Sequence, residues 1–171
     1  METMFSRLII RYKDLEDTTF MWRGVYNTLT DRKEDYPYGG TYARAHFRSI
    51  RSDIEFEAAS YRRLQESDYT AEEVEALHNG PIEGLSHHCR GIWGQRLFVT
   101  KGGLIGRGPG ETRAGDMIYL LHEGRLPFIL RPIKSGEKRG CFEYVWHAYV
   151  HGVMDGEALR GSFAGEWVTL A

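Results

Sequence analysis

The chain has 171 residues, a formal net charge of −2, and 42% hydrophobic and 27% charged residues, a composition typical of an ordinary globular domain. Its length fits a single domain, because domains commonly contain about 100–200 residues. Its lysines and arginines are scattered among acids, which argues against a nucleic-acid or membrane-surface partner. Residues 1–10 contain charges and only a short apolar run, so we expect no signal peptide and a cytoplasmic protein.

The first half of the chain, residues 1–93, has the sequence pattern of helices, with apolar residues three and four positions apart. Thr70 and Glu73 form a capping box, which is a signal for the start of a helix. The second of the predicted helices has an apolar face that can continue as far as Leu64. The predicted helices cover residues 17–32, 43–54, 70–80 and 81–91.

The second half, residues 94–171, changes to short runs rich in β-branched and aromatic residues, separated by glycine-rich turns. Such runs predict a small antiparallel β-barrel or a curled sheet. We therefore expect one α+β domain over residues 1–171, in which the N-terminal helices pack on the C-terminal sheet and share its core. The predicted strands lie in residues 95–100, 115–123, 126–132 and 141–152.

The glycine-rich segment at residues 106–110 invites comparison with a phosphate-binding loop. Such a loop needs a helix N-terminus after its glycines, so that backbone N–H groups point at the phosphate. Here Pro109, Gly110 and Gly115 lead into an apolar strand instead. We predict that residues 106–110 form a turn between strands and that no nucleotide binds there.

An ordered series of motifs runs from Cys89 to Glu157. The motifs are Cys89-Arg90-Gly91, Phe98-Val99-Thr100, Gly106 to Pro109, Gly115-Asp116, Pro127 to Arg131 and Tyr149 to Glu157. This series resembles the C-terminal region of fungal heterokaryon-incompatibility (HET) domain proteins. The resemblance implies a fungal protein, here detached from the HET domain itself, which is the part associated with incompatibility signalling. It implies no activity, because that C-terminal region has no catalytic motif to carry over.

Histidines and cysteines raise the question of a metal. His147 and His151 are four residues apart, which on one strand separates them by roughly 13 Å, too far to share a zinc ion. The run His87-His88-Cys89 falls on a predicted helix, where adjacent side chains diverge by about 100°. We therefore predict no metal and no cofactor. Two cysteines, Cys89 and Cys141, do not make a disulfide framework, and Cys89 is best interpreted as a buried helical thiol.

The aromatic segment at residues 142–161 is the strongest candidate for a site. As one extended strand it would have two faces that both mix apolar and polar side chains, unlike a plain core strand. Trp146 and His147 also stand where the resembled family often has Gly and Glu. We predict a pocket between the helices and the sheet. The catalytic candidates are Tyr144, Trp146, His147 and Tyr149, and the candidates for substrate contact are Phe142, His151 and Trp93.

Three functions remain open from the sequence. The first hypothesis is a cofactor-free enzyme of fungal specialised metabolism, which binds an apolar small molecule and promotes a cyclisation or an intramolecular [4+2] cycloaddition by shape and hydrogen-bond polarisation. The second is a non-catalytic protein-binding or regulatory module derived from HET incompatibility proteins. The third is a hydrolase or isomerase with acid/base chemistry at Asp155, Glu157 or a histidine. The enzyme requires an enclosed aromatic pocket, whereas a binding module requires an exposed apolar patch.

Overall fold

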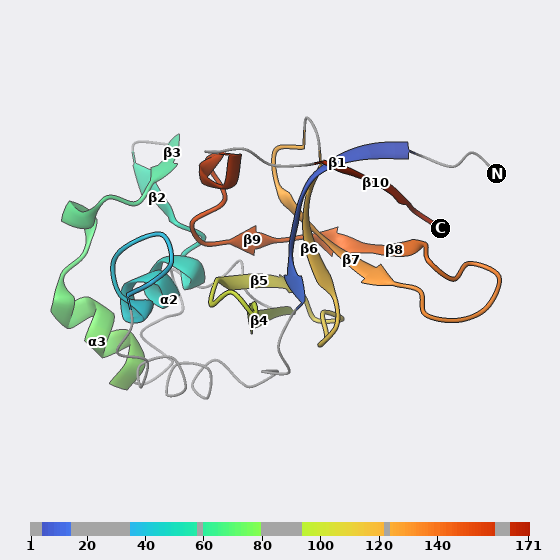
Figure 1. Ribbon diagram of the computed structural model, residues 1–171. Helices are drawn as coiled ribbons and strands as arrows, with labels where there is room; N and C mark the ends of the chain where they lie inside the picture. The colour runs from blue at the N-terminus through green and yellow to red at the C-terminus, as the bar shows by residue number, and fades with distance from the viewer. Residues whose placement is uncertain (1–4, 15–34, 58–59, 80–93, 122–123, 160–164) are drawn as a thin grey trace.

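Figure 1 shows the computed structural model of the chain, in which sheets form most of the described part and the described α-helices lie at one end. The statements that follow concern the residues that the structure describes. These are residues 5–14, 35–57, 60–79, 94–121, 124–159 and 165–171.

The largest unit is a five-stranded antiparallel sheet with the strand order β10-β1-β6-β7-β8. One parallel bridge, between Phe142 and Leu170, links its two edge strands, and the Ala171 N–H donates to the Phe142 carbonyl at 3.0 Å. The sheet is therefore curled, but within the described residues it is not closed into a barrel. Its strands are β1 (Phe5–Asp14), β6 (Met117–Leu121), β7 (Pro127–Pro132), β8 (Phe142–His147) and β10 (Glu166–Thr169).

A bent strand connects this sheet to a second one, of order β4-β5-β9. The chain leaves β8 at Ala148, whose N–H still donates to the Pro127 carbonyl of β7 at 2.8 Å. It then continues as β9, which pairs with β5 instead of β7. The predicted single strand over residues 141–152 is thus two strands in two sheets. The second sheet contains β4 (Gln95–Val99), β5 (Ile105–Pro109) and β9 (Tyr149–Val150).

The remaining elements are two helices and a hairpin, which gather on the left in Figure 1. Thr41 caps the first helix by accepting a hydrogen bond from the Arg44 N–H at 3.3 Å. The predicted capping box of the second helix is confirmed, since Thr70 and Glu73 exchange hydrogen bonds of 2.7 and 3.2 Å. The elements are α2 (Tyr42–Ile50), α3 (Ala71–Asn79), β2 (Ile54–Glu57) and β3 (Ser60–Arg63), with short 3₁₀ turns at Glu66–Asp68 and Glu157–Leu159.

Both faces of the five-stranded sheet are buried, because alternate residues of its central strands enter different cores. Ile118 and Ile129 are fully buried in the core that β4, β5 and α2 share. Met117, Tyr119 and Leu130 lie in a second core on the opposite face. Each such side chain contributes about 1.5–3 kcal/mol by leaving water. A smaller third core, around Phe47, Leu64, Tyr69 and Val74, holds α2 and α3 together.

The prediction of α+β class is confirmed, but the first half of the chain is less helical than the sequence indicates. Residues 5–14 form strand β1, which pairs with β6 and β10. The helix predicted to run from residue 43 towards Leu64 ends at Ile50, because Ser52 and Asp53 adopt positive φ angles of 59° and 58° and reverse the chain into the β2–β3 hairpin. The helices predicted over residues 17–32 and 81–91 lie outside the described residues.

The predicted turn at residues 106–110 is wrong, because residues 105–109 form strand β5. A Cβ atom on Gly106 would lie 2.4 Å from the Phe98 ring, and one on Gly108 would lie 2.4 Å from the Ile129 side chain. Glycine at these positions therefore lets neighbouring side chains cross directly over the strand. No helix begins in this segment, as expected.

Candidate functional site

An open hollow of about 610 Å³ lies where the two sheets and the β2–β3 hairpin meet, and we call it the junction hollow. The hairpin supplies one wall, the ends of β4 and β5 supply another, and the bend between β8 and β9 supplies the third. Its lining includes Ile54, Tyr61, Leu126, Trp146 and Tyr149 among apolar and aromatic residues, and Ser52, Arg63, Gln95, Arg107 and His147 among polar ones.

The hollow exists because two neighbouring strands separate. The last pair between β5 and β9 joins Arg107 to Tyr149. Beyond it, β5 ends at Pro109, which has no N–H to donate, while β8 turns away to pair with β7. The edge of β8 that faces away from β7 therefore has, in the part of the chain that the structure describes, no strand partner apart from the bridge at Phe142.

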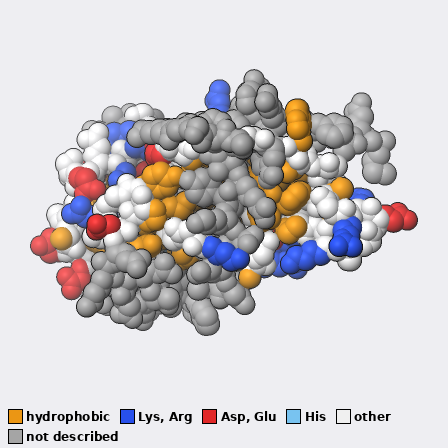
Figure 2. Space-filling model, viewed as in Figure 1, with side chains coloured by type: hydrophobic (Ala, Val, Ile, Leu, Met, Phe, Trp, Pro, Cys, Tyr) orange, Lys and Arg blue, Asp and Glu red, His pale blue; other side chains and the backbone are white. Residues whose placement is uncertain are grey.

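The rim of the hollow is unusually apolar for a surface. Seven large apolar side chains are exposed among the described residues, and four of them line the hollow. Trp146 is 51% exposed and Tyr61 75%, and the ring of Tyr144 lies beside Trp146 at a centroid distance of 6.1 Å. Figure 2 shows hydrophobic side chains reaching the surface over the region of β5 and β9 and again over β6 to β8. Exposed apolar patches are typical of binding surfaces.

A buried arginine lies against the inner wall. Arg107 is 7% exposed, donates to the Ser52 hydroxyl, and holds its guanidinium carbon 5.7 Å from the centre of the Tyr149 ring. A cation over an aromatic face is attractive, and more so away from water. Arg107 therefore ties the turn between α2 and β2 to strand β9 at the hollow.

Behind the wall that Arg107 lines, the buried Tyr149 pairs with the partly buried His151. A 2.9 Å hydrogen bond joins the Tyr149 hydroxyl to His151 Nδ1. Burial raises the pKa of Tyr149 well above its usual range. Burial, and then the positive charges of Arg48 and Arg63, lower the pKa of His151 to about 4. Both side chains are neutral at pH 7, so the charged groups around them are Arg48 and Arg63 with their partners Asp53 and Asp155.

The pair makes stability depend on pH in a defined window. Between pH 6.5 and pH 4 the unfolded chain takes up a proton at His151 that the folded chain does not, so the free energy of unfolding falls as the pH falls. We expect a loss of about 2 kcal/mol across this window, allowing for the partial exposure of His151. His151→Gln should flatten the dependence of the unfolding free energy on pH, as measured by urea titrations between pH 4 and pH 6.5. Equal slopes in the original protein and in His151→Gln would contradict the assignment.

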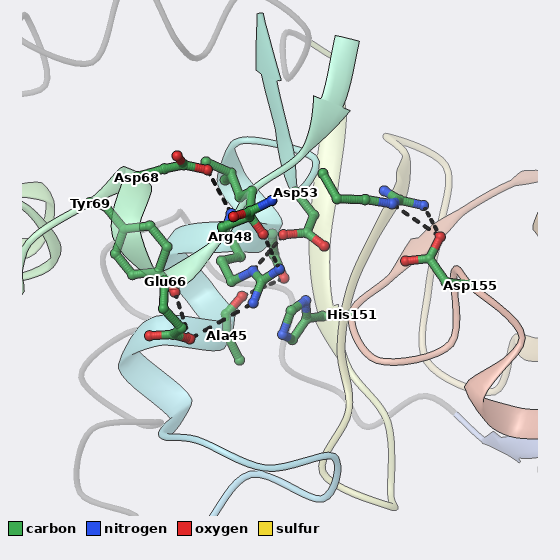
Figure 3. A network of polar contacts seen from close by, with 12 residues as sticks. Ala45, Arg48, Asp53, Glu66, Asp68, Tyr69, His151 and Asp155 are labelled. Carbon is green, nitrogen blue, oxygen red and sulfur yellow. Dashed lines mark hydrogen bonds and ion pairs between the residues drawn. The ribbon is translucent and has the colours of Figure 1, made fainter.

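A network of ion pairs fixes the hairpin next to the hollow (Figure 3). Arg48 of α2 binds Asp53 in the turn before β2, and its Nη2 also donates to the Leu64 carbonyl at 2.7 Å. Arg63 of β3 binds Asp155, in the turn after β9, through Nε and Nη2 at 3.1 and 2.8 Å. The network thus joins α2, the hairpin and the segment that follows β9, and Figure 3 shows His151 beside it.

The structure brings some of the residues predicted from the sequence to one place. Trp146, His147 and Tyr149 line the junction hollow. Tyr144 stands next to Trp146. A catalytic role for these four residues stays a prediction.

The predicted substrate contacts do not gather in the same way. Phe142 lies away from the hollow, where its ring packs on Tyr119 at 5.4 Å. His151 lies behind Tyr149, and Trp93 is outside the described residues. Cys141, a free thiol, precedes β8, and Cys89 is also outside the described residues.

Sequence reasoning missed the residues that the hairpin and β5 contribute, namely Ile54, Tyr61, Arg63 and Arg107. The hairpin falls in a segment predicted as helix, and Arg107 falls in a predicted turn. Among the described residues, no group of three or more His, Cys, Asp or Glu side chains is placed to hold a metal ion. None of the described helices has the length and apolarity needed to cross a membrane.

Comparison with known proteins decides the family. The model of the Het-6 beta-barrel domain matches residues 11–162, which is most of the chain. The chain belongs to the Het-6 beta-barrel domain family. It is also similar to heterokaryon incompatibility protein 6, OR allele, of Neurospora crassa, with 33% identity over 75 residues. That match covers 44% of this chain and 11% of the relative, so the chain spans a small part of the relative's length. No solved structure matches the chain.

Membership of the Het-6 beta-barrel domain family confirms the resemblance to fungal HET proteins and corrects the functional expectation. The first hypothesis, a cyclase or cycloaddition enzyme of specialised metabolism, is wrong. The family model and the relative both point to heterokaryon incompatibility, and neither indicates a biosynthetic enzyme. The error arose because the aromatic residues of β8 were expected to wall an enclosed pocket, whereas Tyr144 and Trp146 are 41% and 51% exposed beside an open hollow.

Proposed function

We propose that this chain is a non-catalytic recognition module of the heterokaryon incompatibility family, and that the junction hollow docks a segment of another protein. The observation that carries the proposal is the concentration of exposed apolar side chains around one open hollow. Ile54, Tyr61, Leu126 and Trp146 all line it, and each is at least 37% exposed. Exposed aromatic side chains that surround a concave surface are typical of binding hot spots.

The wall of the hollow is also rigid enough for recognition. Arg107 fastens the turn between α2 and β2 to β9, and the Arg48–Asp53 and Arg63–Asp155 pairs hold the hairpin on α2 and on the turn after β9. A site whose walls are already ordered loses less conformational entropy when a partner binds. These contacts fix the position of the hairpin wall relative to β9 before any partner arrives.

Site-specific crosslinking tests this function. A photoreactive phenylalanine analogue placed at Trp146 should crosslink to a discrete protein in the cells that produce the chain. The same analogue at Trp167 serves as the control, because this side chain is 66% exposed but lies on β10. The crosslinked protein is then purified and its affinity measured. We expect Trp146→Ala to weaken binding at least tenfold, which corresponds to loss of a hot-spot aromatic, and Trp167→Ala to leave it unchanged. Equal crosslinking at both positions, or equal affinity of both variants, would refute docking at the hollow.

A further inference from the structure

Four neighbouring rings lie along β8 and reach into the junction hollow. They belong to Phe128 of β7 and to Tyr144, Trp146 and His147 of β8, and we call them the aromatic cluster. The Tyr144 ring centroid lies 5.8 Å from that of Phe128 and 6.1 Å from that of Trp146, which in turn lies 5.3 Å from that of His147. Tyr144 and Trp146 are 41% and 51% exposed, and Trp146 and His147 also line the hollow. The cluster therefore extends the apolar surface of the hollow along β8.

The open edge of β8 is poorly suited to the addition of another strand. Ile129 of β7 pairs with Trp146. The next residue, Leu130, pairs with Tyr144, so Val145 is an extra residue without a partner on β7. Such a bulge interrupts the even spacing of backbone N–H and C=O groups that an added strand requires. We therefore expect a partner to bind here through the side chains of the aromatic cluster and not by extending the sheet.

The exposed rings of the cluster carry hydrogen-bond donors. The indole N–H of Trp146 and the hydroxyl of Tyr144 donate to none of the described residues. An indole N–H can only donate, and a phenol hydroxyl can donate as well as accept. The described lining of the hollow contains no Asp or Glu, whose oxygens would accept from a partner's N–H groups. This surface therefore suits a segment that offers carbonyl oxygens and has few N–H groups of its own.

A proline-rich segment has these properties. Each proline offers a carbonyl oxygen and an apolar ring but no backbone N–H. Its polyproline II helix has three residues per turn and no internal hydrogen bonds, so its carbonyl oxygens are available to a partner. The helix is formed before binding and loses little conformational entropy when it docks on aromatic side chains. It also needs no charged site, which agrees with the pairing of Arg63 with Asp155 at the rim.

We propose that the aromatic cluster and the junction hollow bind a proline-rich segment of a partner protein in the polyproline II conformation. Proline rings pack against Trp146 and Tyr144, and the indole N–H and the phenol hydroxyl donate to carbonyl oxygens of the segment. This inference rests on the recognition function proposed above and adds the chemical class of the partner. The rings supply affinity, and the two donors select a backbone with free carbonyl oxygens.

The first test uses a random library of 12-residue peptides selected on the purified full chain. We expect enriched peptides to carry two prolines three positions apart, which is one turn of the polyproline II helix. A synthetic copy of the most enriched peptide should bind at least tenfold more tightly than its counterpart with Ala in place of each Pro. Its affinity should change less than about twofold as salt is raised, because no ion pair carries the binding.

The second test separates the donors from the rings. Trp146→Phe and Tyr144→Phe each keep a ring and remove a donor, and each should weaken binding of the selected peptide about three- to tenfold, the effect of one lost hydrogen bond. Trp167→Phe on β10, outside the hollow lining, should leave the affinity unchanged. All three side chains are exposed, so we expect the variants to fold, and urea unfolding checks this. Unchanged affinity in both Trp146→Phe and Tyr144→Phe would overturn the inference.

The outcomes separate the two proposals. Enriched peptides that lack proline and lose binding in Trp146→Ala would overturn the proline-rich partner and keep docking at the hollow. Enriched peptides that bind Trp146→Ala as well as the original protein would overturn both. A library from which nothing is enriched would overturn the proline-rich partner, and crosslinking at Trp146 would then decide docking on its own. Binding of cellohexaose that requires Trp146, with no peptide selected, would mark a carbohydrate site and would overturn both proposals.

Discussion

Replacing Arg48 by Ala should cost about 3–5 kcal/mol of unfolding free energy, the range expected when one partner of a buried ion pair is removed. The Arg48 side chain is 21% exposed and that of its partner Asp53 is 9% exposed. Burial already raises the pKa of Asp53, and the hydrogen bond and charge of Arg48 oppose that rise. Without the guanidinium, an uncompensated carboxylate is left in a buried turn, and the Leu64 carbonyl loses a donor.

Urea unfolding followed by tryptophan fluorescence measures this loss, and a neighbouring arginine provides the control. Arg44 lies on the same helix and pairs with Glu66, but the two side chains are 48% and 60% exposed. Arg44→Ala should therefore cost less than about 1 kcal/mol. The double variant Arg48→Met with Asp53→Asn removes both charges, and Asn tolerates a positive φ, so it should recover at least half of the loss. A loss below about 1 kcal/mol in Arg48→Ala would show that the Arg48–Asp53 pair does not stabilise the turn between α2 and β2.

Gly106→Ala should destabilise the chain by about 3 kcal/mol, because a Cβ atom at this position overlaps fixed neighbours. It would lie 2.4 Å from two atoms of the Phe98 ring and 2.7 Å from the Tyr149 carbonyl oxygen. Phe98 is 3% exposed and has no free space to enter, and the carbonyl belongs to the backbone of β9. The cost arises from forcing β5 and β9 apart at the inner end of the hollow.

Gly110→Ala is the matched control for this change. The nearest atom to its added Cβ is the Gly94 carbonyl oxygen at 3.1 Å, a contact that a shift of a few tenths of an ångström relieves. We expect a change of less than about 1 kcal/mol in its thermal or urea unfolding. Similar stabilities of the Gly106→Ala and Gly110→Ala proteins would contradict the close approach of Phe98 to β5.

Strands β4, β6 and β7 could be predicted because their residues are short apolar runs between glycine turns. Leu97, Ile118 and Ile129 all lie where such runs place them. The bend at Ala148 could not be predicted, because the run from residue 142 to 151 has no glycine or proline and its local preferences are those of one strand. The run becomes two strands only because its first part pairs with β7 and its last part pairs with β5, and neither pairing can be read from the run itself.

The sequence could predict the residues that the β8–β9 run contributes to the hollow, but not those of the β2–β3 hairpin. Trp146, His147 and Tyr149 belong to one run of sequence, predicted as a single strand, in which apolar and polar residues mix on both faces. All three line the hollow. The opposite wall depends on the reversal at Ser52 and Asp53, which both adopt a conformation that non-glycine residues rarely take. Helical spacing from Phe47 to Ile54 fits the sequence equally well, so nothing local indicates the hairpin that carries Tyr61 and Arg63.

Docking at the junction hollow is the central claim, and amide hydrogen exchange with and without the crosslinked partner tests it most directly. Binding at the hollow should slow exchange over residues 143–149, where the β8 edge and the bend lie, and over residues 52–63 of the hairpin. Helix α3, residues 71–79, contributes nothing to the lining and should exchange as before. Slower exchange at α3 or β10, with residues 143–149 unchanged, would contradict the claim.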